Sequence, residues 1–368
     1  MKTKAELYDE RLARITTAVA LGTPDRVPVV PLASAFCAHH LGVKYSDFAR
    51  DPELAAGTML KSFSWLGEVD GVQVPIFSPH FFSSGLLYKV AIPGIDLPDD
   101  IPWQIREAEL MVESDYDVII SKGYKFFYED FLMNRLDNPM AKLGPTLGYM
   151  PTAIANVKEA GLVPLSPLIL FSPFEIFSGA RSMGKFVRDM YRIPDKLQEA
   201  MNIAQEQIIM DSRGLLRFVG PMAAWVTGAR AASEALAPKL WNRFAWPYFK
   251  QLVEMVNEEG VIPLLHIDSN WERDLERFKE LPKAKCIFSS DHATNIFKIK
   301  EVLGDHMCIM GDVPAAILAL GTPDDVHAYA VRLVREIGPA GFILSSGCDI
   351  PFNAKPENVA AMIAAVHC

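Results

Sequence analysis

The chain has 368 residues, of which 50% are hydrophobic and 22% are charged, enough for a large core and too apolar for a disordered chain. Its net charge of −9 excludes the basic face that nucleic-acid binding requires. No apolar run approaches the length of a membrane span, and residues 1–14 are charged, without the apolar segment of a signal peptide. We therefore expect a cytoplasmic protein with no membrane partner.

Short apolar segments alternate along the chain with amphipathic helical stretches, and no low-complexity linker divides them. We therefore interpret residues 1–368 as a single domain. Eight strands are expected, at residues 27–32, 71–77, 165–171, 222–226, 261–266, 286–289, 307–310 and 342–344. Strands that alternate with helices predict an α/β fold with a parallel sheet, and closure into a (β/α)8 TIM barrel is the economical arrangement.

Capping residues indicate where several helices begin. We expect one helix from about Asp51 to Leu66, one that begins at Thr322, and one that begins near Lys355. Thr322 is followed by a proline and two aspartates, a pattern typical of an N-cap with proline at the first helical position.

The second and third strands are separated by a long insertion, residues 78–164. We expect a hairpin around residues 88–95 of this insertion, and an aromatic run occupies residues 124–128. If the insertion leaves from a βα loop, it lies over the C-terminal mouth of the barrel, where barrel enzymes carry out their chemistry.

Groups that bind metals or move protons follow the last four strands. They are His266 and Asp268 after the fifth, Asp291 after the sixth, Asp312 after the seventh and Cys348 after the eighth. Residues i and i+2 of a strand face the same side, so His266 and Asp268 can share one cavity, which Cys348 can reach from the barrel mouth. Together, His, Asp and Cys would form a three-ligand zinc site with an open fourth position.

Each of these residues also has a structural interpretation. Asp291 and Asp312 could cap the helices that follow them instead of acting as acids. Cys348 could be an inert buried thiol, and Cys308, inside the seventh strand, is either a core residue or a deeper ligand.

The remaining cysteines and two histidines carry weaker signals. Cys286 and Cys368 have no ligand neighbours at a suitable spacing, and Cys37 has only His39 and His40 nearby. Adjacent residues face apart, so at most one of the two histidines enters the site; we take His39 as a candidate acid or base.

Several motifs spread over nearly the whole chain belong together. They are residues 10–11, 21–28, 228–230, 237–248, 311–314, 347–348 and 356–358. In combination they resemble the uroporphyrinogen decarboxylase superfamily, and its cobalamin-dependent methyltransferase branch more than the decarboxylases. The resemblance implies a (β/α)8 barrel, in agreement with the strand pattern.

The methyltransferase branch binds zinc through a His-x-Cys pair after the fifth strand and a distant cysteine after the eighth. His266 and Cys348 match the first and last ligands, whereas Asp268 stands at the middle position. The resemblance therefore implies a zinc site at His266, Asp268 and Cys348. The alternatives for the third ligand are Cys308, Asp291 and Asp312.

The decarboxylases of the superfamily carry arginines after the first strand, which hold the carboxylates of the porphyrinogen. Residues 27–49 contain no arginine and a single lysine. A polycarboxylate would leave its charges unpaired there, which is costly. We therefore place decarboxylation behind methyl transfer.

Two reactions are known in the methyltransferase branch. One carries a methyl group from a corrinoid protein to a thiol such as coenzyme M, and the other demethylates a donor and passes the group to cob(I)alamin on a partner corrinoid protein. A carboxylate ligand makes zinc a harder Lewis acid, which suits an ether oxygen, and aromatic residues around the insertion could stack on a ring. We therefore expect a small methoxyaromatic donor, with Asp291 or Asp312 orienting a ligand or protonating the leaving phenolate.

The cobalamin is expected on a separate corrinoid protein, because the chain lacks the Asp-x-His-x-x-Gly motif of a cobalamin-binding module. The thiol methyltransferase, a decarboxylase-like lyase and a non-catalytic binding protein stay open as alternatives. The sequence does not determine the oligomeric state, and a homodimer is one possible assembly.

Overall fold

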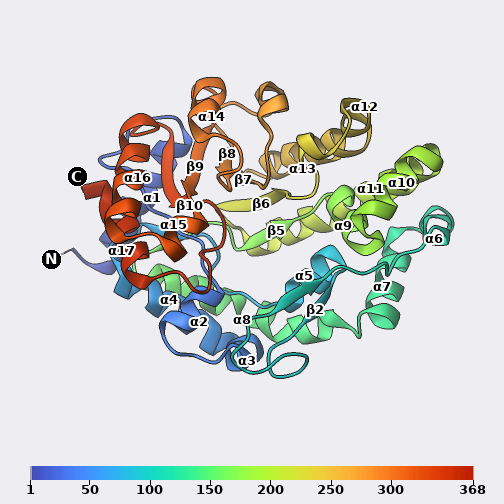
Figure 1. The fold of residues 1–368 in the computed structure, drawn as a ribbon, viewed down its shortest axis with the longest axis horizontal. Helices are drawn as coiled ribbons and strands as arrows, with labels where there is room; N and C mark the ends of the chain where they lie inside the picture. Colours follow the sequence, from blue (N-terminus) through green and yellow to red (C-terminus); the bar gives the residue numbers. More distant parts are fainter. Residues whose placement is uncertain (1, 368) are drawn as a thin grey trace.

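Six parallel strands form one sheet in the order β10-β9-β8-β7-β6-β5 in the computed structural model, which describes residues 2–367 (Figure 1). The strands are β1 (Gly71–Val72), β2 (Lys89–Ala91), β3 (Gln104–Arg106), β4 (Val163–Pro164), β5 (Leu168–Leu170), β6 (Ala223–Gly228), β7 (Ile262–Ile267), β8 (Ile287–Ser290), β9 (Cys308–Val313) and β10 (Phe342–Ser346). The strands expected in the second half of the chain all occur at or near their predicted positions.

Backbone hydrogen bonds complete the ring of strands between β10 and β5. The N–H of Val30 donates to the carbonyl of Leu344 over 3.0 Å, which joins the extended segment 28–31 to β10. The N–H of Asp70 donates to the carbonyl of Val29 over 2.9 Å, which joins the same segment to the chain entering β1. β1 in turn pairs in parallel with β4, just before β5. The predicted (β/α)8 TIM barrel is therefore confirmed, although regular pairing is sparse on this side.

Prolines explain why the first three strands are shorter than predicted. Pro28 and Pro31 lie in the first segment, Pro75 follows β1, and Pro164 and Pro167 flank the break between β4 and β5. A proline has no N–H to give to a strand ladder, so regular pairing stops near each one.

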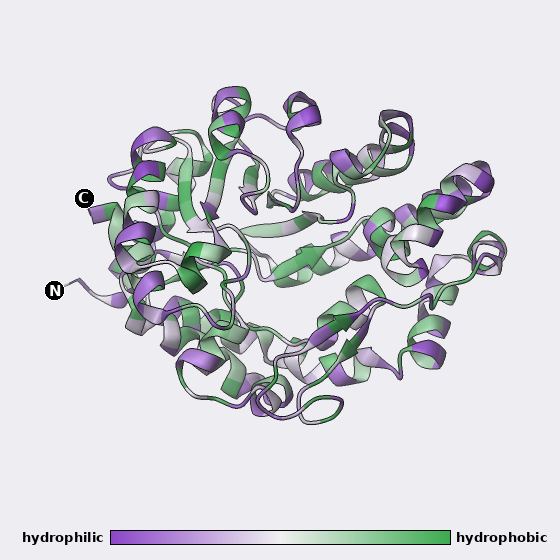
Figure 2. Ribbon diagram, in the orientation of Figure 1, coloured by the Kyte–Doolittle hydropathy of each residue, from purple (hydrophilic) through white to green (hydrophobic). Residues whose placement is uncertain are grey.

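Helices surround the sheet, and Figure 2 shows hydrophobic strands at the centre with hydrophilic turns on the outer helices. The helices are α1 (Lys4–Val19), α2 (Ala35–His40), α3 (Tyr45–Arg50), α4 (Pro52–Leu66), α5 (His80–Leu86), α6 (Ser114–Lys122), α7 (Tyr124–Arg135), α8 (Pro139–Glu159), α9 (Pro173–Arg181), α10 (Met183–Arg192), α11 (Pro194–Val219), α12 (Pro238–Leu240), α13 (Trp246–Glu258), α14 (Ile296–Leu303), α15 (Ala315–Leu320), α16 (Pro323–Glu336) and α17 (Pro356–Ala364). Within residues 2–367, none of them has the length and apolarity needed to cross a membrane.

The predicted helix starts at Asp51, Thr322 and Lys355 are confirmed. The Asp51 side chain accepts hydrogen bonds from the first backbone N–H groups of α4. Thr322 and Asp325 form a reciprocal capping box at the start of α16, and Lys355 precedes α17. Such caps satisfy N–H groups that have no partner inside the helix.

The insertion between β1 and β4 contains α5, the β2–β3 hairpin and helices α6 to α8. β2 pairs antiparallel with β3, so the hairpin encloses residues 92–103. The hairpin predicted around residues 88–95 is therefore wrong in its second strand. The aromatic run at residues 124–128 forms the first turns of α7.

A buried ion pair ties α1 to the N-terminal end of the barrel. Asp70 is fully buried and binds Nη1 of Arg14 at 2.5 Å and Nη1 of Arg26 at 2.7 Å. It also accepts the backbone N–H of Val29 at 2.8 Å. Arg26 belongs to the motif at residues 21–28, so that motif has a structural function at the end of the barrel away from the candidate site.

Candidate active site

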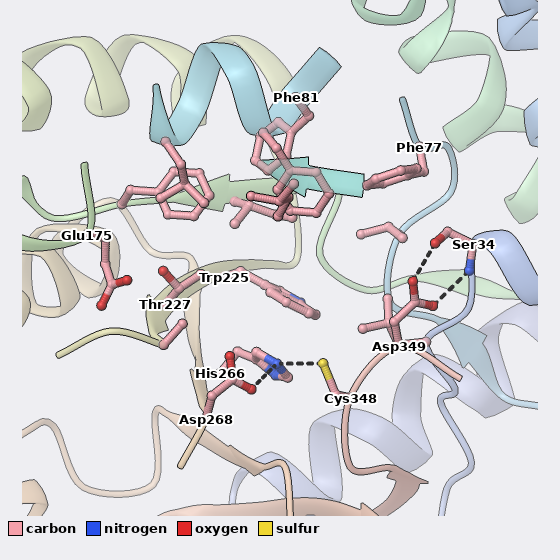
Figure 3. A pocket seen from close by; sticks show the side chains of 18 of the residues that line it. Ser34, Phe77, Phe81, Glu175, Trp225, Thr227, His266, Asp268, Cys348 and Asp349 are labelled. Atoms are coloured by element: carbon pink, nitrogen blue, oxygen red, sulfur yellow. Dashed lines mark hydrogen bonds and ion pairs between the residues drawn. The ribbon is translucent and has the colours of Figure 1, made fainter. Parts of the chain in front are cut away.

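His266, Asp268 and Cys348 converge at the C-terminal mouth of the barrel (Figure 3). Nε2 of His266 lies 3.4 Å from Sγ of Cys348 and 3.3 Å from Oδ1 of Asp268. One ligand atom from each residue lies within 4.8 Å of the other two, and no other such trio of His, Cys, Asp or Glu occurs within residues 2–367. The i and i+2 residues at the end of β7 thus share one side, and the loop after β10 brings the thiol to them.

The spacing of these atoms suits a zinc ion. Zinc bonds of about 2.0–2.3 Å in tetrahedral geometry place ligand atoms roughly 3.3–3.8 Å apart. The two distances from Nε2 of His266, 3.4 Å and 3.3 Å, fall in this range. The imidazole is fixed by stacking on Trp225, with ring centroids 4.3 Å apart. Two of the three separations between the nitrogen, oxygen and sulfur atoms therefore match a tetrahedral zinc site, and the third is within 4.8 Å.

The charge around His266 depends on its two neighbours. Burial disfavours the imidazolium, but Cys348 and Asp268 outweigh burial and raise the pKa of His266 to about 10. A zinc ion must therefore displace a proton from His266, because only the neutral imidazole nitrogen can be a ligand.

The three residues line a cavity of about 280 Å³ whose wall is largely apolar. Its aromatic lining residues are Phe77, Phe81, Phe82, Tyr88, Phe171 and Trp225. The lining acids are Glu175, Asp268 and Asp349, and the lining bases are Arg230 and His266. The β1–β4 insertion contributes Phe77, Phe81, Phe82 and Tyr88, as expected for an insertion over the barrel mouth.

Glu175 and Thr227 also line this cavity, although neither was predicted from the sequence. Glu175 lies in the first turn of α9, is 1% exposed, and accepts the backbone N–H groups of Arg230 and Ala231 at 3.0 Å. Burial nevertheless raises its pKa to about 7. Thr227 lies on β6, and its buried Oγ1 has no hydrogen-bond partner among the described residues. Glu175 follows the third strand of the barrel, and attention to every strand end would have found it.

Asp291 and Asp312 do not line the cavity, contrary to expectation. Asp291 accepts the backbone N–H groups of Ser269 at 2.9 Å and Ala293 at 2.8 Å, so it shapes two loops. Asp312 faces the helix layer, where the hydroxyl of Tyr329 on α16 donates to it over 2.8 Å. Nδ1 of His292 lies 3.1 Å from the other carboxylate oxygen of Asp312, so both oxygens are engaged outside the cavity.

Cys308 is fully buried in β9, in register with Ile287 of β8, and burial raises the pKa of its thiol well above the usual range. It lies outside the trio of ligand groups and behaves as a core residue. His39, in the last turn of α2, packs its ring edge against Phe352 and does not line the cavity. The expected entry of His39 into the site is therefore not observed.

Cys37 and Cys286 do not line the cavity. Cys37 and Cys286 are buried, and burial raises the pKa of each thiol to about 12. Cys368 lies outside the described residues.

The fold and the site define a (β/α)8 barrel with a candidate metal centre at the C-terminal mouth. A model of the family described as "Uroporphyrinogen decarboxylase (URO-D)" matches residues 127–368, and the chain belongs to this family. The uroporphyrinogen decarboxylase of Geobacter metallireducens is 23% identical over 356 residues, which cover 93% of this chain and 94% of that protein. The human uroporphyrinogen decarboxylase is 24% identical over 250 residues, which cover 64% of this chain and 66% of that protein.

A methyltransferase from Methanosarcina mazei has a similar structure, with a TM-score of 0.70 over 96% of this chain and 97% of that one. The two sequences are 17% identical, so the match shows a shared fold. The predicted resemblance to the superfamily is confirmed.

Proposed function

We propose that this protein is a zinc-dependent methyltransferase that demethylates a phenyl methyl ether and passes the methyl group to cob(I)alamin on a partner corrinoid protein. The observation that carries the proposal is the convergence of His266, Asp268 and Cys348 on the wall of an apolar, aromatic cavity. The shared fold with a methyltransferase supports the same class of reaction.

His266, Asp268 and Cys348 would hold the zinc ion, with the fourth position open to the substrate oxygen. Bound there, zinc would supply Lewis-acid polarisation of the ether oxygen. A ligand set with one thiolate, one carboxylate and one imidazole is harder than one with two thiolates, which favours an oxygen ligand over a sulfur ligand.

The cavity wall would bind and orient the aromatic ring. An apolar cavity of roughly 150 Å³ holds a benzene molecule, so the cavity of about 280 Å³ has room for a substituted ring. Phe81 and Phe171 lie with ring centroids 5.5 Å apart on this wall, and Phe81 also contacts Phe82. Edge and offset packing against such rings fixes an aromatic substrate and excludes water from the reacting carbon.

The names of the sequence relatives favour a second candidate, uroporphyrinogen decarboxylation. The charges of the cavity weigh against it. A polycarboxylate would meet the carboxyl groups of Glu175, Asp268 and Asp349 and two cations, Arg230 and the His266 imidazolium, which is already paired with Asp268. The Arg230 guanidinium already donates to the hydroxyl of Tyr88 and to Glu107. Carboxylates brought into this cavity would be left unpaired, which is costly.

An anaerobic assay with the zinc-loaded chain, free cob(I)alamin and a series of methoxybenzenes tests the proposal. We expect methylcobalamin and the matching phenol in equal amounts, with loss of both products after chelation of zinc or in His266→Ala. Carbon dioxide release from uroporphyrinogen that resists the chelator would instead establish the decarboxylase. Methyl transfer from methylcobalamin to a thiol, with no activity on ethers, would establish the thiol methyltransferase.

A further inference from the structure

Glu175 is a buried carboxyl group that faces the cavity without a cation bonded to it in the described part of the chain. Its two oxygens accept hydrogen bonds from the backbone N–H groups of Arg230 and Ala231. The guanidinium of Arg230 is turned toward the hydroxyl of Tyr88 and toward Glu107 instead. A buried carboxylate with no ion-pair partner is costly, so this environment favours a carboxyl group that carries a proton.

The Thr227 hydroxyl is a second polar group at this wall of the cavity. Thr227 is 5% exposed, and its Oγ1 has no hydrogen-bond partner within residues 2–367. Thr227 pairs in register with His266 on the neighbouring parallel strand, so both side chains leave the same face of the sheet. Figure 3 places Glu175 and Thr227 toward the Asp268 end of the trio and Cys348 toward the other end. An unpartnered buried hydroxyl beside the trio indicates a ligand atom that it would bind.

We infer that Glu175 is the general acid that protonates the ether oxygen as the methyl group leaves, with the Thr227 hydroxyl hydrogen-bonded to that oxygen. This inference rests on the proposed function and adds the source of the proton. Glu175 thus takes the acid role predicted from the sequence for Asp291 or Asp312, neither of which lines the cavity.

The step balances with cob(I)alamin as the co-reactant. The bond between the methyl carbon and the ether oxygen breaks, and its electron pair stays on the oxygen. The O–H bond of Glu175 breaks, and the proton goes to the same oxygen, which yields the phenol and the Glu175 carboxylate. Cobalt(I) supplies the electron pair of the new cobalt–carbon bond and becomes methylcobalt(III). Solvent returns a proton to Glu175 after the phenol leaves.

The ionisation of Glu175 suits this role. Burial raises the pKa of Glu175 to about 7, against the lowering effect of the two backbone N–H groups. The charged and titratable groups that face it are Arg230, which lowers its pKa, Asp268, which raises it, and Tyr88. A general acid is most effective when its pKa lies near the working pH. The rate with a poor leaving group should therefore be full below pH 7 and fall as the pH rises above it.

Glu175→Gln tests the inference against a series of methoxybenzenes whose phenols differ in acidity. Glutamine keeps an oxygen that can accept the backbone N–H groups but has no acidic proton. We expect kcat/KM to fall by about 10²–10⁴-fold for ethers of weakly acidic phenols. The loss should shrink for nitro-substituted ethers, whose phenolates leave without a proton. The decline of wild-type activity above pH 7 should disappear in the variant, and Glu175→Asp should restore part of the rate.

Two controls separate catalysis from a structural defect. Zinc content and Tm should match the wild type in Glu175→Gln, and Glu206→Gln, at an exposed position of α11, should leave the kinetics unchanged. An equal loss for every leaving group, or no loss, would overturn the inference while leaving the proposed function intact. A wild-type chain that demethylates no ether at all would overturn both.

Discussion

Asp268 is the residue at which this site departs from the ligand pattern of the methyltransferases that it resembles. The Asp268 carboxylate lies 3.3 Å from Nε2 of His266. The methyltransferase branch that the sequence resembles has a cysteine thiolate at this position. His266, Asp268 and Cys348 could be predicted together from sequence because strand ends of a barrel meet at one mouth. Glu175 was missed because a lone glutamate in a first helical turn forms no motif and its chemistry comes from burial, although its place after the third strand is visible in the sequence.

Replacing the carboxylate by a thiolate should weaken ether demethylation while preserving metal binding. We expect Asp268→Cys to keep one equivalent of zinc and to lower kcat with methoxybenzenes by about tenfold, or about 1.4 kcal/mol in the barrier. The expected cause is a softer, less acidic metal ion. Steady-state kinetics beside metal analysis would check it, and a variant as active as the wild type would show that the carboxylate has no special part in the reaction.

The proton on His266 should make the affinity for zinc depend on pH. Its pKa of about 10 means that the metal-free imidazole carries a proton at neutral pH, which zinc must release. The apparent affinity should therefore rise with pH, by up to about tenfold per pH unit for one proton, until the pH reaches that pKa. Calorimetric titration in buffers of different ionisation enthalpy measures the protons released, and zinc binding without proton release would contradict the expectation.

Among the elements, α5 contributes Phe81 and Phe82 to the aromatic wall of the cavity, and the polar groups come from β6, the end of β7, α9 and the loop after β10. The strands of the second half were predictable because each is a continuous apolar run. The β2–β3 hairpin was predictable only in its first strand, because the turn signal at Pro93-Gly94 indicates a short hairpin whereas residues 92–103 separate the two strands. The exclusion of Asp312 from the cavity was not predictable, since it depends on contacts with His292 and Tyr329 that the order of residues does not reveal.

Removing an aromatic ring of α5 from the cavity wall should weaken substrate binding more than it slows the chemical step. Phe81→Ala removes a ring that packs against Phe82 and Phe171 in the cavity. We expect KM for methoxybenzenes to rise by about tenfold with little change in kcat, because the ring contacts the substrate equally in the ground and transition states. Phe126→Ala, at an exposed position of α7, is the matched control and should change neither constant.

At the scale of the whole molecule, one end of the barrel stabilises the fold and the other end carries the candidate active site. The N-terminal end is held by the fully buried Asp70 with Arg14 and Arg26, and the C-terminal end carries the cavity. The barrel could be predicted from the alternation of apolar segments with helices. The sparse pairing of its first strands could also have been anticipated, since the prolines are visible in the sequence.

Breaking the ion pair should destabilise the fold without altering the site. Asp70→Asn leaves Arg14 and Arg26 without their buried counter-charge, and removal of one partner of such a pair costs about 3–5 kcal/mol in the free energy of unfolding. Urea denaturation would measure this loss. Asp47→Asn, which removes an exposed pair with Arg50, should cost less than about 1 kcal/mol. Equal stability of the two variants would mean that the Asp70 cluster is not what holds α1 in place.

X-ray absorption at the zinc edge, with metal quantification on the same sample, tests the metal centre most directly. We predict one zinc per chain, with one sulfur at about 2.3 Å and the other ligands nitrogen or oxygen at about 2.0–2.2 Å. Asp268→Cys should add a second sulfur, and zinc should be lost in His266→Ala and Cys348→Ser. A wild-type chain that binds no zinc, or whose zinc has no sulfur ligand, would contradict the account.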